Sequence, residues 1–244
     1  MSPADEHLAN DPTSELWGEH RARYRFAGQW ARGCRVLDVA CGAGFGVQLL
    51  AQAGAYPIGV DLDARALAEA RALEPAARLV RADAACLPLP DAAFDLVTSF
   101  ETLEHVPDAA ALLGELRRVL RPGGRLVLST PNRAFGPSEH HQNPFHLREF
   151  EADELRQLLQ RAFSTVRLFG QRPSPAYRYV PYLLVERRYE PAALVWKMLN
   201  RLPFGLKNAI ALALSGRPFY PGETDYCFDA AVVGSHVLVA VAVA

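Results

Sequence analysis

Residues 36–46 read VLDVACGAGFG, and this stretch decides the fold of the chain. Apolar residues surround Asp38 before the sequence breaks into a glycine-rich turn, and VQLLAQAGA then resumes with helical spacing. The pattern predicts a strand, a tight turn and a helix. Glycines let the backbone bend sharply and let a ligand approach the main chain, while the N–H groups that begin a helix attract an anionic group. The stretch therefore predicts a site for a nucleotide-like cofactor.

Strands and helices alternate beyond this turn. We expect further strands at 57–60, 78–82, 94–100, 125–130 and 164–170 and helices at 15–31, 64–73, 109–120 and 151–162. The alternation predicts a parallel sheet with helices on both faces, in which ligands bind beyond the carboxyl ends of the strands. The polar residues that follow the strands are Asp61, Asp83, Glu101, Glu104 and His105. We therefore expect an active site along that edge of the sheet.

Composition narrows the class of protein. The chain has 244 residues, half of them hydrophobic, which suits one domain with an embellishment better than two equal domains. A net charge of −1 is not the strongly basic charge that is typical of a nucleic-acid-binding protein. The four cysteines form no CxxC pair, so neither a zinc site nor a disulfide framework is indicated. The polar residues 1–20 lack the apolar core of a signal peptide, and no apolar run reaches the roughly 18 residues of a membrane span. The sequence predicts a cytoplasmic protein with reduced cysteines.

Five motifs in order resemble those of class I S-adenosylmethionine-dependent methyltransferases. They are VLDVACGAGFG at 36–46, GVDLD at 59–63, RADAACLPLP at 81–90, FDLVTSFETLEHV at 94–106 and LRPGGRLVLSTPN at 120–132. The resemblance implies a Rossmann-like, seven-stranded, mostly parallel sheet with helices on both faces. It also implies S-adenosyl-L-methionine as the cofactor and S-adenosyl-L-homocysteine as the product. A nicotinamide-binding domain is the competing interpretation, but ACGAG lacks the GxGxxG register.

The resemblance assigns a role to each cofactor residue. Gly42 and Gly44 would face the aminocarboxylate, and Asp38 would bind it directly or through a water. Asp61 would accept hydrogen bonds from both ribose hydroxyls, and Asp83 would hold the adenine amino group. Ala84 would add a backbone contact, Leu62 would pack on the adenine ring, and Phe100 and Glu101 complete the predicted set. Ala40 departs from the family pattern, which usually has glycine there, and we expect this substitution to be tolerated.

The segment EHRARYRFA at 19–27 resembles the element that precedes the first strand in methyltransferases of sugars and natural products. In those enzymes an Arg or a Tyr closes over the methionine end of the cofactor. Tyr24 and Arg23 are the candidates for this contact. The alternative is that Tyr24 belongs to the core and that Arg23, on the polar side of the helix with His20, is solvated.

Candidate acceptor residues follow the fourth and fifth strands. Glu101, Glu104 and His105 have spacings of three, one and four, so they share a face if the segment makes a helical turn. The polar loop after the fifth strand adds His146, which precedes an acidic-aromatic pair. A hydroxyl acceptor needs a general base or a metal, because it is nearly all protonated at neutral pH. We expect His105, His146 and Glu104 to be the catalytic residues.

A metal at this place is an open alternative that we do not favour. The E-x-x-E-H string with its downstream His resembles small-RNA 2′-O-methyltransferases that use a divalent ion, but it also resembles methyltransferases that need no metal. If a metal binds, the predicted ligands are Glu101, Glu104, His105 and His146. Otherwise Glu101 touches the cofactor, Glu104 faces solvent and a His orders the loop.

Residues 173–228 interrupt the chain where the family turns directly into its last strand. We expect a helical insert there, with helices at 192–201 and 206–214, which serves as an acceptor lid or a dimer surface. A peripheral membrane face is the weaker alternative, because basic charges are few. The candidate pocket residues of this insert are Tyr177, Tyr179, Tyr182, Arg187, Arg188 and Tyr220. The whole chain, 1–244, is expected to be one domain, with a cofactor-binding core at 15–170 and the last strand at 235–244.

The function predicted from the sequence is methyl transfer to a small molecule. The preferred acceptor is a hydroxyl oxygen of a sugar or natural-product metabolite, as in natural-product biosynthesis, with a ubiquinone-type phenol less favoured. The alternatives are a metal-dependent RNA 2′-O-methyltransferase, an N- or C-methyltransferase of a small molecule, and a non-catalytic S-adenosylmethionine-binding protein. The near-neutral charge and the lack of a basic, aromatic-interleaved strip disfavour RNA and DNA as partners. A homodimer is left open.

Overall fold

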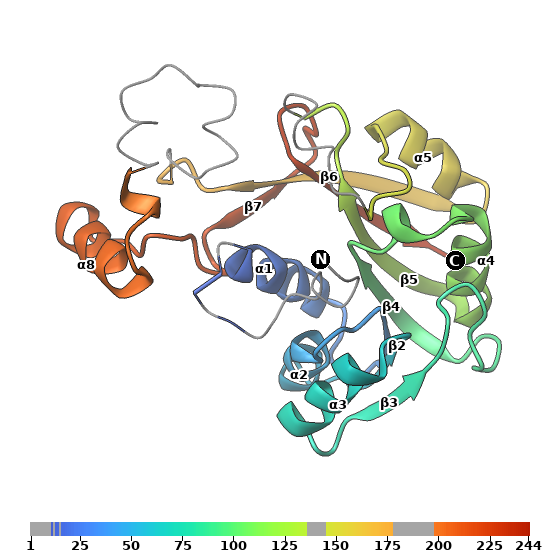
Figure 1. Ribbon diagram of the computed structural model, residues 1–244. Helices are drawn as coiled ribbons and strands as arrows, with labels where there is room; N and C mark the ends of the chain where they lie inside the picture. Colours follow the sequence, from blue (N-terminus) through green and yellow to red (C-terminus); the bar gives the residue numbers. More distant parts are fainter. Residues whose placement is uncertain (1–10, 12, 15, 136–144, 178–197) are drawn as a thin grey trace.

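The computed structural model describes residues 11, 13–14, 16–135, 145–177 and 198–244. A twisted sheet forms its centre, with α1, α2 and α3 on one side and α4 and α5 on the other (Figure 1). The helices are α1 (Trp17–Gly28), α2 (Phe45–Gln52), α3 (Ala64–Leu73), α4 (Ala109–Val119), α5 (Ala152–Gln160) and α8 (Phe204–Ser215), with a 3₁₀ turn, η2, at Leu103–His105. No helix of the described part of the chain is both long and apolar enough to cross a membrane.

Within the described residues the sheet has eight strands, in the order β3-β2-β1-β4-β5-β8-β6-β7. They are β1 (Arg35–Val39), β2 (Tyr56–Asp61), β3 (Arg78–Arg81), β4 (Phe94–Phe100), β5 (Leu120–Pro131), β6 (Thr165–Pro173), β7 (Tyr226–Asp229) and β8 (Val237–Val243). The first five in this order are parallel, and the last three pair antiparallel. The prediction of a Rossmann-like, mostly parallel sheet with helices on both faces is confirmed.

The prediction of seven strands is wrong, because β7 adds an eighth at the edge. This strand pairs with β6 and contains only four residues, of which Tyr226 is buried and Cys227 is exposed. A strand of four residues is too short to show a clear alternation of apolar and polar side chains, and the preceding SGRPFYPGETD is rich in turn-forming residues. The sequence therefore did not predict this strand. The segment predicted as a helical insert therefore also contains a strand.

Side-chain alternation along the strands places the two larger core clusters on opposite faces of the sheet. Leu37 and Val39 of β1 face α4 and α5, whereas Val36 faces α1 and α2. Asp38 lies two residues after Val36 on the same strand, so its side chain points to the same face of the sheet, toward α1. This assignment decides what Asp38 contacts.

Capping side chains explain where α3 and α4 begin. Asp63 caps α3 by accepting a hydrogen bond from the Arg65 backbone N at 2.8 Å. Asp108 caps α4 by accepting from the backbone N of Ala110 and Ala111. Such caps satisfy the donors that the first helical turn leaves free. Both helices begin where the sequence predicts.

β5 is longer than predicted. We expected a helix to continue to residue 120 and the strand to begin at 125, but Leu120 already pairs with Phe94. The register shifts between Phe94 and Leu96, and Gly123 takes a left-handed φ of 77°. The glycines thus form an irregular stretch within the strand.

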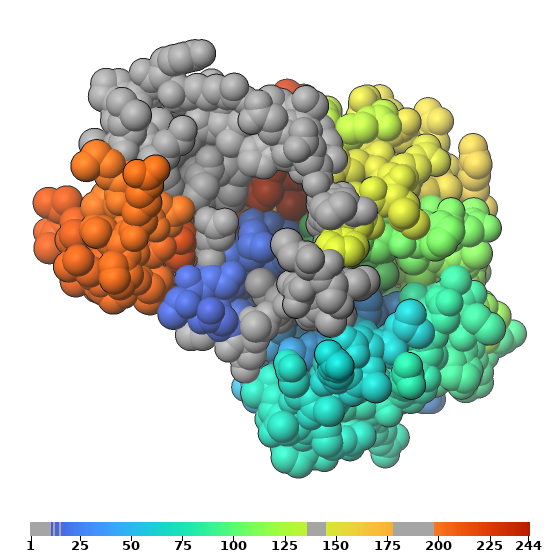
Figure 2. Space-filling model, in the orientation of Figure 1, coloured from blue at the N-terminus to red at the C-terminus, as the bar shows by residue number. Residues whose placement is uncertain are grey.

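The described part of the insert centres on α8, which confirms the helix expected at 206–214. The helix expected at 192–201 lies largely outside the described residues. Figure 2 shows the residues around α8, in orange, as a lobe at one side of the molecule. Lys207 is buried on α8 and donates to Asn200 Oδ1 at 2.8 Å and to Tyr220 OH at 2.7 Å. These bonds hold the helix to the segments on either side of it.

Candidate functional site

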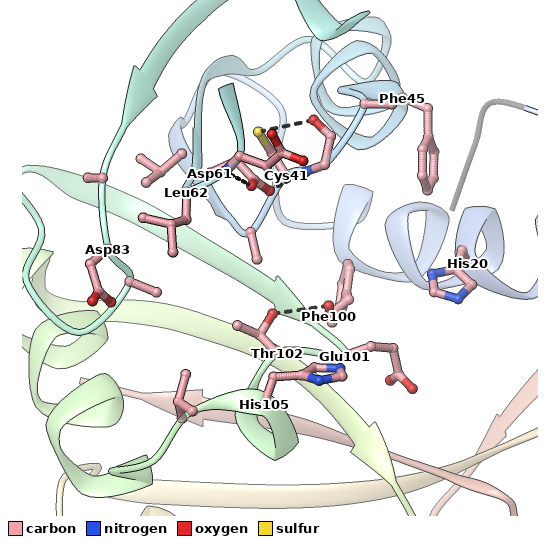
Figure 3. A pocket seen from close by; sticks show the side chains of 18 of the residues that line it. His20, Cys41, Phe45, Asp61, Leu62, Asp83, Phe100, Glu101, Thr102 and His105 are labelled. Carbon is pink, nitrogen blue, oxygen red and sulfur yellow. Dashed lines mark hydrogen bonds between the residues drawn. The ribbon is translucent and has the colours of Figure 1, made fainter. Parts of the chain in front are cut away.

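A cavity of about 660 Å³ opens at the carboxyl ends of β1, β2, β3 and β4 (Figure 3). Its walls come from the glycine turn, from the residues that follow three neighbouring strands, and from α1. The predicted site residues that line it are Tyr24, Gly42, Asp61, Leu62, Asp83, Ala84, Phe100, Glu101 and His105. Four other predicted residues, Asp38, Gly44, Glu104 and His146, are not part of its lining.

The turn after β1 is held in shape by Asp61. The Gly42 backbone N donates to Asp61 Oδ2, and the Asp63 backbone N donates to Asp61 Oδ1, both at 2.8 Å. Asp61 is only 5% exposed, so its carboxylate is fixed between two turns of the backbone. Each oxygen keeps lone-pair capacity for a further donor. This geometry suits a pair of ligand hydroxyls.

Gly44 has a packing role rather than a place in the cavity wall. Its φ is 80°, and a Cβ at this position would lie 2.5 Å from the Cβ of Ala70 on α3. Only glycine permits both the left-handed backbone and the close approach. Gly44 thus sets the position at which α2 starts.

Two cavity residues that are not glycine have a left-handed backbone. Ala40 has φ 59° and Glu101 has φ 49°. Such conformations cost about 1–3 kcal/mol for residues with a Cβ, and they gather at functional sites. Ala40 therefore adopts, at this cost, a left-handed conformation that glycine takes freely.

Asp38 lies beneath Tyr24 and is fully buried. Tyr24 OH lies 3.1 and 3.2 Å from the two Asp38 oxygens, and Thr98 Oγ1 donates to Oδ1 at 2.6 Å. Burial raises the pKa of Asp38 to about 7, although the Thr98 and Tyr24 hydrogen bonds oppose it. The Tyr24 ring packs edge-on against Phe45 and Phe100. In this structure Asp38 orients Tyr24, and Tyr24 lines the cavity.

A buried ionic network lies behind Glu101. Arg23 pairs with Glu19, donates from Nε to Gln171 Oε1 at 2.6 Å, and places Nη1 3.2 Å from Glu101 Oε1. His236 Nε2 lies 3.0 Å from Glu19 Oε2. Arg23 is 0% exposed, so the alternative of a solvated Arg23 is wrong. The network connects α1 to residues near the opposite end of the sequence.

The pKa values in this network follow from burial and from charge. Burial alone would raise the pKa of Glu19, but His236 and Arg23 lower it to about 2. Burial alone would lower the pKa of Arg23, but Glu101 and Glu19 raise it above its ordinary value. Both groups are therefore charged at neutral pH. Ser129 Oγ donates to Glu101 Oε1 at 2.5 Å and completes the support of that carboxylate.

Glu104, His105 and His146 form a separate cluster, in which one ligand atom from each residue lies within 4.8 Å of the others. Glu104 is fully buried, so the alternative that it faces solvent is wrong. Its Oε2 accepts from Thr130 Oγ1 at 2.9 Å, and within the described residues its Oε1 has no hydrogen-bond partner. Burial and the nearby Glu101 raise its pKa well above the ordinary value.

The two imidazoles of this cluster are oriented through their Nδ1 atoms. His105 Nδ1 lies 3.1 Å from the Phe145 carbonyl oxygen, and His146 Nδ1 lies 2.8 Å from Glu149 Oε1. The rings pack edge-on with centroids 4.9 Å apart. Glu101, the fourth ligand named for the case that a metal binds, is not in the group, and Arg23 and Ser129 hold its carboxylate.

His20 lines the cavity, although the sequence analysis placed it only on the polar side of the first helix. Leu16 and His20 precede Tyr24 by eight and four residues, and all three line the cavity. Residues four apart share a helix face. Leu16 and His20 could therefore have been predicted as cavity residues from Tyr24, which the sequence did indicate.

Of the tyrosines and arginines proposed from the insert, Tyr177 and Tyr220 lie in the described part of the chain, and neither lines this cavity. Tyr177 OH lies 3.3 Å from Asp225 Oδ2, and Tyr220 bonds Lys207, so both belong to the support of the α8 region. Tyr179, Tyr182, Arg187 and Arg188 lie outside the described residues. A role for this insert in acceptor binding stays a prediction.

The fold and the cavity define an α/β domain that binds a nucleotide-like cofactor at the carboxyl edge of a parallel sheet. Residues 37–128 match the family model described as a methyltransferase domain. Over 145 residues the chain is 41% identical to a protein of Mycolicibacterium smegmatis described as a probable S-adenosylmethionine-dependent methyltransferase, covering 59% of this chain and 56% of that protein. Over 107 residues it is 40% identical to a ubiquinone biosynthesis O-methyltransferase of Aeromonas salmonicida, covering 41% and 44%. The chain thus spans about half the length of these curated relatives.

Solved structures agree on the fold. An S-adenosylmethionine-dependent methyltransferase from Archaeoglobus fulgidus superposes with a TM-score of 0.63 at 20% identity over 95% of both chains. A Haemonchus contortus phosphoethanolamine N-methyltransferase 2, in complex with S-adenosyl-L-methionine, gives 0.59 at 20% identity over 93% of this chain and 52% of that one. Residues 37–128 thus match a methyltransferase domain, and the fold is that of S-adenosylmethionine-dependent methyltransferases, as the motifs predict.

Proposed function

We propose that this chain transfers a methyl group from S-adenosylmethionine to a hydroxyl oxygen of a small molecule, with a sugar or natural-product metabolite as the preferred acceptor. The observation that supports this proposal most is the fixed carboxylate of Asp61 beside the glycine turn, in one cavity with Asp83 and Glu101. In the reaction the bond from sulfur to methyl breaks as the bond from oxygen to methyl forms. S-adenosylhomocysteine leaves, and the hydroxyl proton passes to a base.

The proposed role of the protein is mainly to align donor and acceptor, because the sulfonium is already activated. Gly42 and Asp61 would hold the donor, with Asp83, Ala84 and Leu62 around its adenine and Tyr24, Phe100 and Glu101 at its methionine end. Asp38 would act through Tyr24. His105 and Glu101 line the cavity where an acceptor would meet the methyl group. The insert at 173–228 would serve as an acceptor lid or a dimer surface.

The purified chain, supplied with S-adenosylmethionine, is expected to methylate at least one member of a panel of simple sugars, catechols and amines. Mass spectrometry checks for the added methyl group, and S-adenosylhomocysteine should form in equal amount. A hydroxyl product supports O-methyl transfer, whereas an amine product would replace it by N-methyl transfer. Binding of S-adenosylmethionine without any product would favour the non-catalytic interpretation.

We propose, as a second candidate, that Glu104, His105 and His146 bind a divalent cation. The orphaned, buried Glu104 Oε1 favours this proposal, as do two imidazoles whose Nδ1 atoms face a carbonyl and a carboxylate. Metal-binding histidines are commonly oriented in this way by their other ring nitrogen. Methyl transfer from a sulfonium does not itself require a metal, so the cation would polarise the acceptor hydroxyl.

For this cluster we expect calorimetry to show one equivalent of Mn²⁺ or Zn²⁺ bound to the purified chain. His146→Ala should weaken that binding by about 10- to 100-fold, because a nitrogen ligand is lost. His236→Gln, which lies in the buried network instead, is the matched control and should leave the affinity unchanged. No heat of binding with either metal, or equal affinity in His146→Ala, would contradict the site.

A further inference from the structure

His20 presents its imidazole to the cavity from α1. The residue is half-buried and lines the cavity with Glu101 and His105, which reach it from the segment after β4 (Figure 3). No hydrogen bond within the described residues engages the His20 ring, in contrast to His105, His146 and His236. His20 is therefore a polar group that the described residues leave available to a ligand.

The position of His20 separates it from the residues that would hold the nucleoside of the donor. Leu62 and Asp83 lie at the other side of the cavity in the close view, and His20 lies beyond Phe100 and Glu101 (Figure 3). On the proposed function, the donor nucleoside would occupy the side lined by Asp61 and Asp83. The side lined by His20 and Glu101 then remains for the methionine end of the donor and for the acceptor that meets its methyl group.

The charges around His20 decide its protonation state and therefore the kind of ligand that it can bind. Burial and the nearby Arg23 lower the pKa of His20 to about 4, while Glu101 and Glu19 act in the opposite direction. The imidazole is therefore neutral at physiological pH and keeps one nitrogen lone pair. Glu101 offers a carboxylate on the neighbouring wall. Two hydrogen-bond acceptors, one of them anionic, favour a ligand that still carries its proton and disfavour an anion.

We propose that His20 and Glu101 form the acceptor subsite, in which the His20 imidazole accepts the hydrogen bond of a neutral hydroxyl group. The inference rests on the proposed methyl transfer and narrows its substrate class to alcohols and phenols that bind in the protonated form. His20 acts here as a binding residue that orients the hydroxyl. Carboxylates and ionised phenols are excluded by the same two groups.

The probe is 4-nitrophenol, added to the complex of the chain with S-adenosylhomocysteine, because its ionised form absorbs visible light and reports its own protonation state. We expect the probe to bind in its neutral form, so its affinity falls about tenfold for each pH unit above its pKa. In His20→Phe the affinity for the neutral form should fall about five- to tenfold, the loss expected of one hydrogen bond. His20→Gln, whose side-chain carbonyl is also an acceptor, should recover most of that loss.

Arg21→Gln is the matched control, because Arg21 neighbours His20 on α1 but pairs with Glu223. It should bind the probe as the wild type does. Binding of the ionised probe, equal affinity in His20→Phe, or no binding to the wild type at any pH would each overturn the subsite. Calorimetry with S-adenosylhomocysteine on the same proteins separates these outcomes, since a lost donor site would abolish that heat as well.

Discussion

Asp61→Ala is expected to weaken the binding of S-adenosylmethionine by at least about 100-fold. The carboxylate is fixed by the backbone N–H groups of Gly42 and Asp63, and its two oxygens are proposed to accept the two ribose hydroxyls. Each such charge-assisted bond contributes about 1.5–3 kcal/mol, and removing two of them accounts for the loss. The substitution also frees the glycine turn that Gly42 belongs to. Titration calorimetry of the wild type and the variant measures the ratio of dissociation constants.

Asp108→Ala is the control for Asp61, because it also removes a carboxylate that accepts from two backbone N–H groups. Asp108 caps α4 and is not part of the cavity lining, so its loss should cost about 1 kcal/mol of stability and leave donor affinity within about twofold. An Asp61→Ala protein that still binds the donor as tightly as Asp108→Ala would reject the ribose assignment. Circular dichroism at the assay temperature shows that both variants are folded.

The parallel half of the fold was predictable because local signals agree there with the tertiary structure. The residues of α3 combine an Asp63 cap with alanine-rich helical spacing, and β4 is an apolar run between turn signals. Strand ends of a parallel sheet meet at one edge, so Asp61, Asp83 and Glu101 were expected in one place from order alone. They do line one cavity. What each of them binds is a proposal.

The parts that could not be predicted depend on contacts between distant segments. Glu19 and Arg23 look like an ordinary pair on a solvated helix face, but Gln171 and His236 cover them. The sequence around α1 contains no pattern that predicts Gln171 and His236 as partners. For Asp38 the cofactor contact stays a prediction, and the alternation of β1 places its carboxylate 3.1 Å from Tyr24 OH, a contact that the local sequence does not show. In both cases packing, rather than local pattern, decides which polar group faces the ligand.

Arg23→Met is expected to lower the free energy of unfolding by about 3–5 kcal/mol, the largest stability effect that we predict. The guanidinium is fully buried, and its removal leaves the buried Glu19 carboxylate with His236 as its remaining partner and Glu101 without the Arg23 counter-charge. Methionine retains most of the side-chain volume, so the cost reflects charge more than a cavity. Urea denaturation followed by circular dichroism measures the change. Arg25→Met, two residues along α1 with a side chain 57% exposed, should cost no more than about 0.5 kcal/mol.

The double variant Glu19→Gln/Arg23→Met distinguishes a buried charge pair from simple packing. A neutral glutamine needs far less compensation than an isolated carboxylate, so the double variant should recover more than half of the stability that Arg23→Met loses. A purely steric role for Arg23 predicts instead that the two losses add. Recovery in the double variant would mean that Arg23 is held on α1 as the counter-charge of Glu19 and Glu101. The Glu101 carboxylate, which lines the cavity, would then depend for its position on Arg23, a fully buried residue outside the cavity lining.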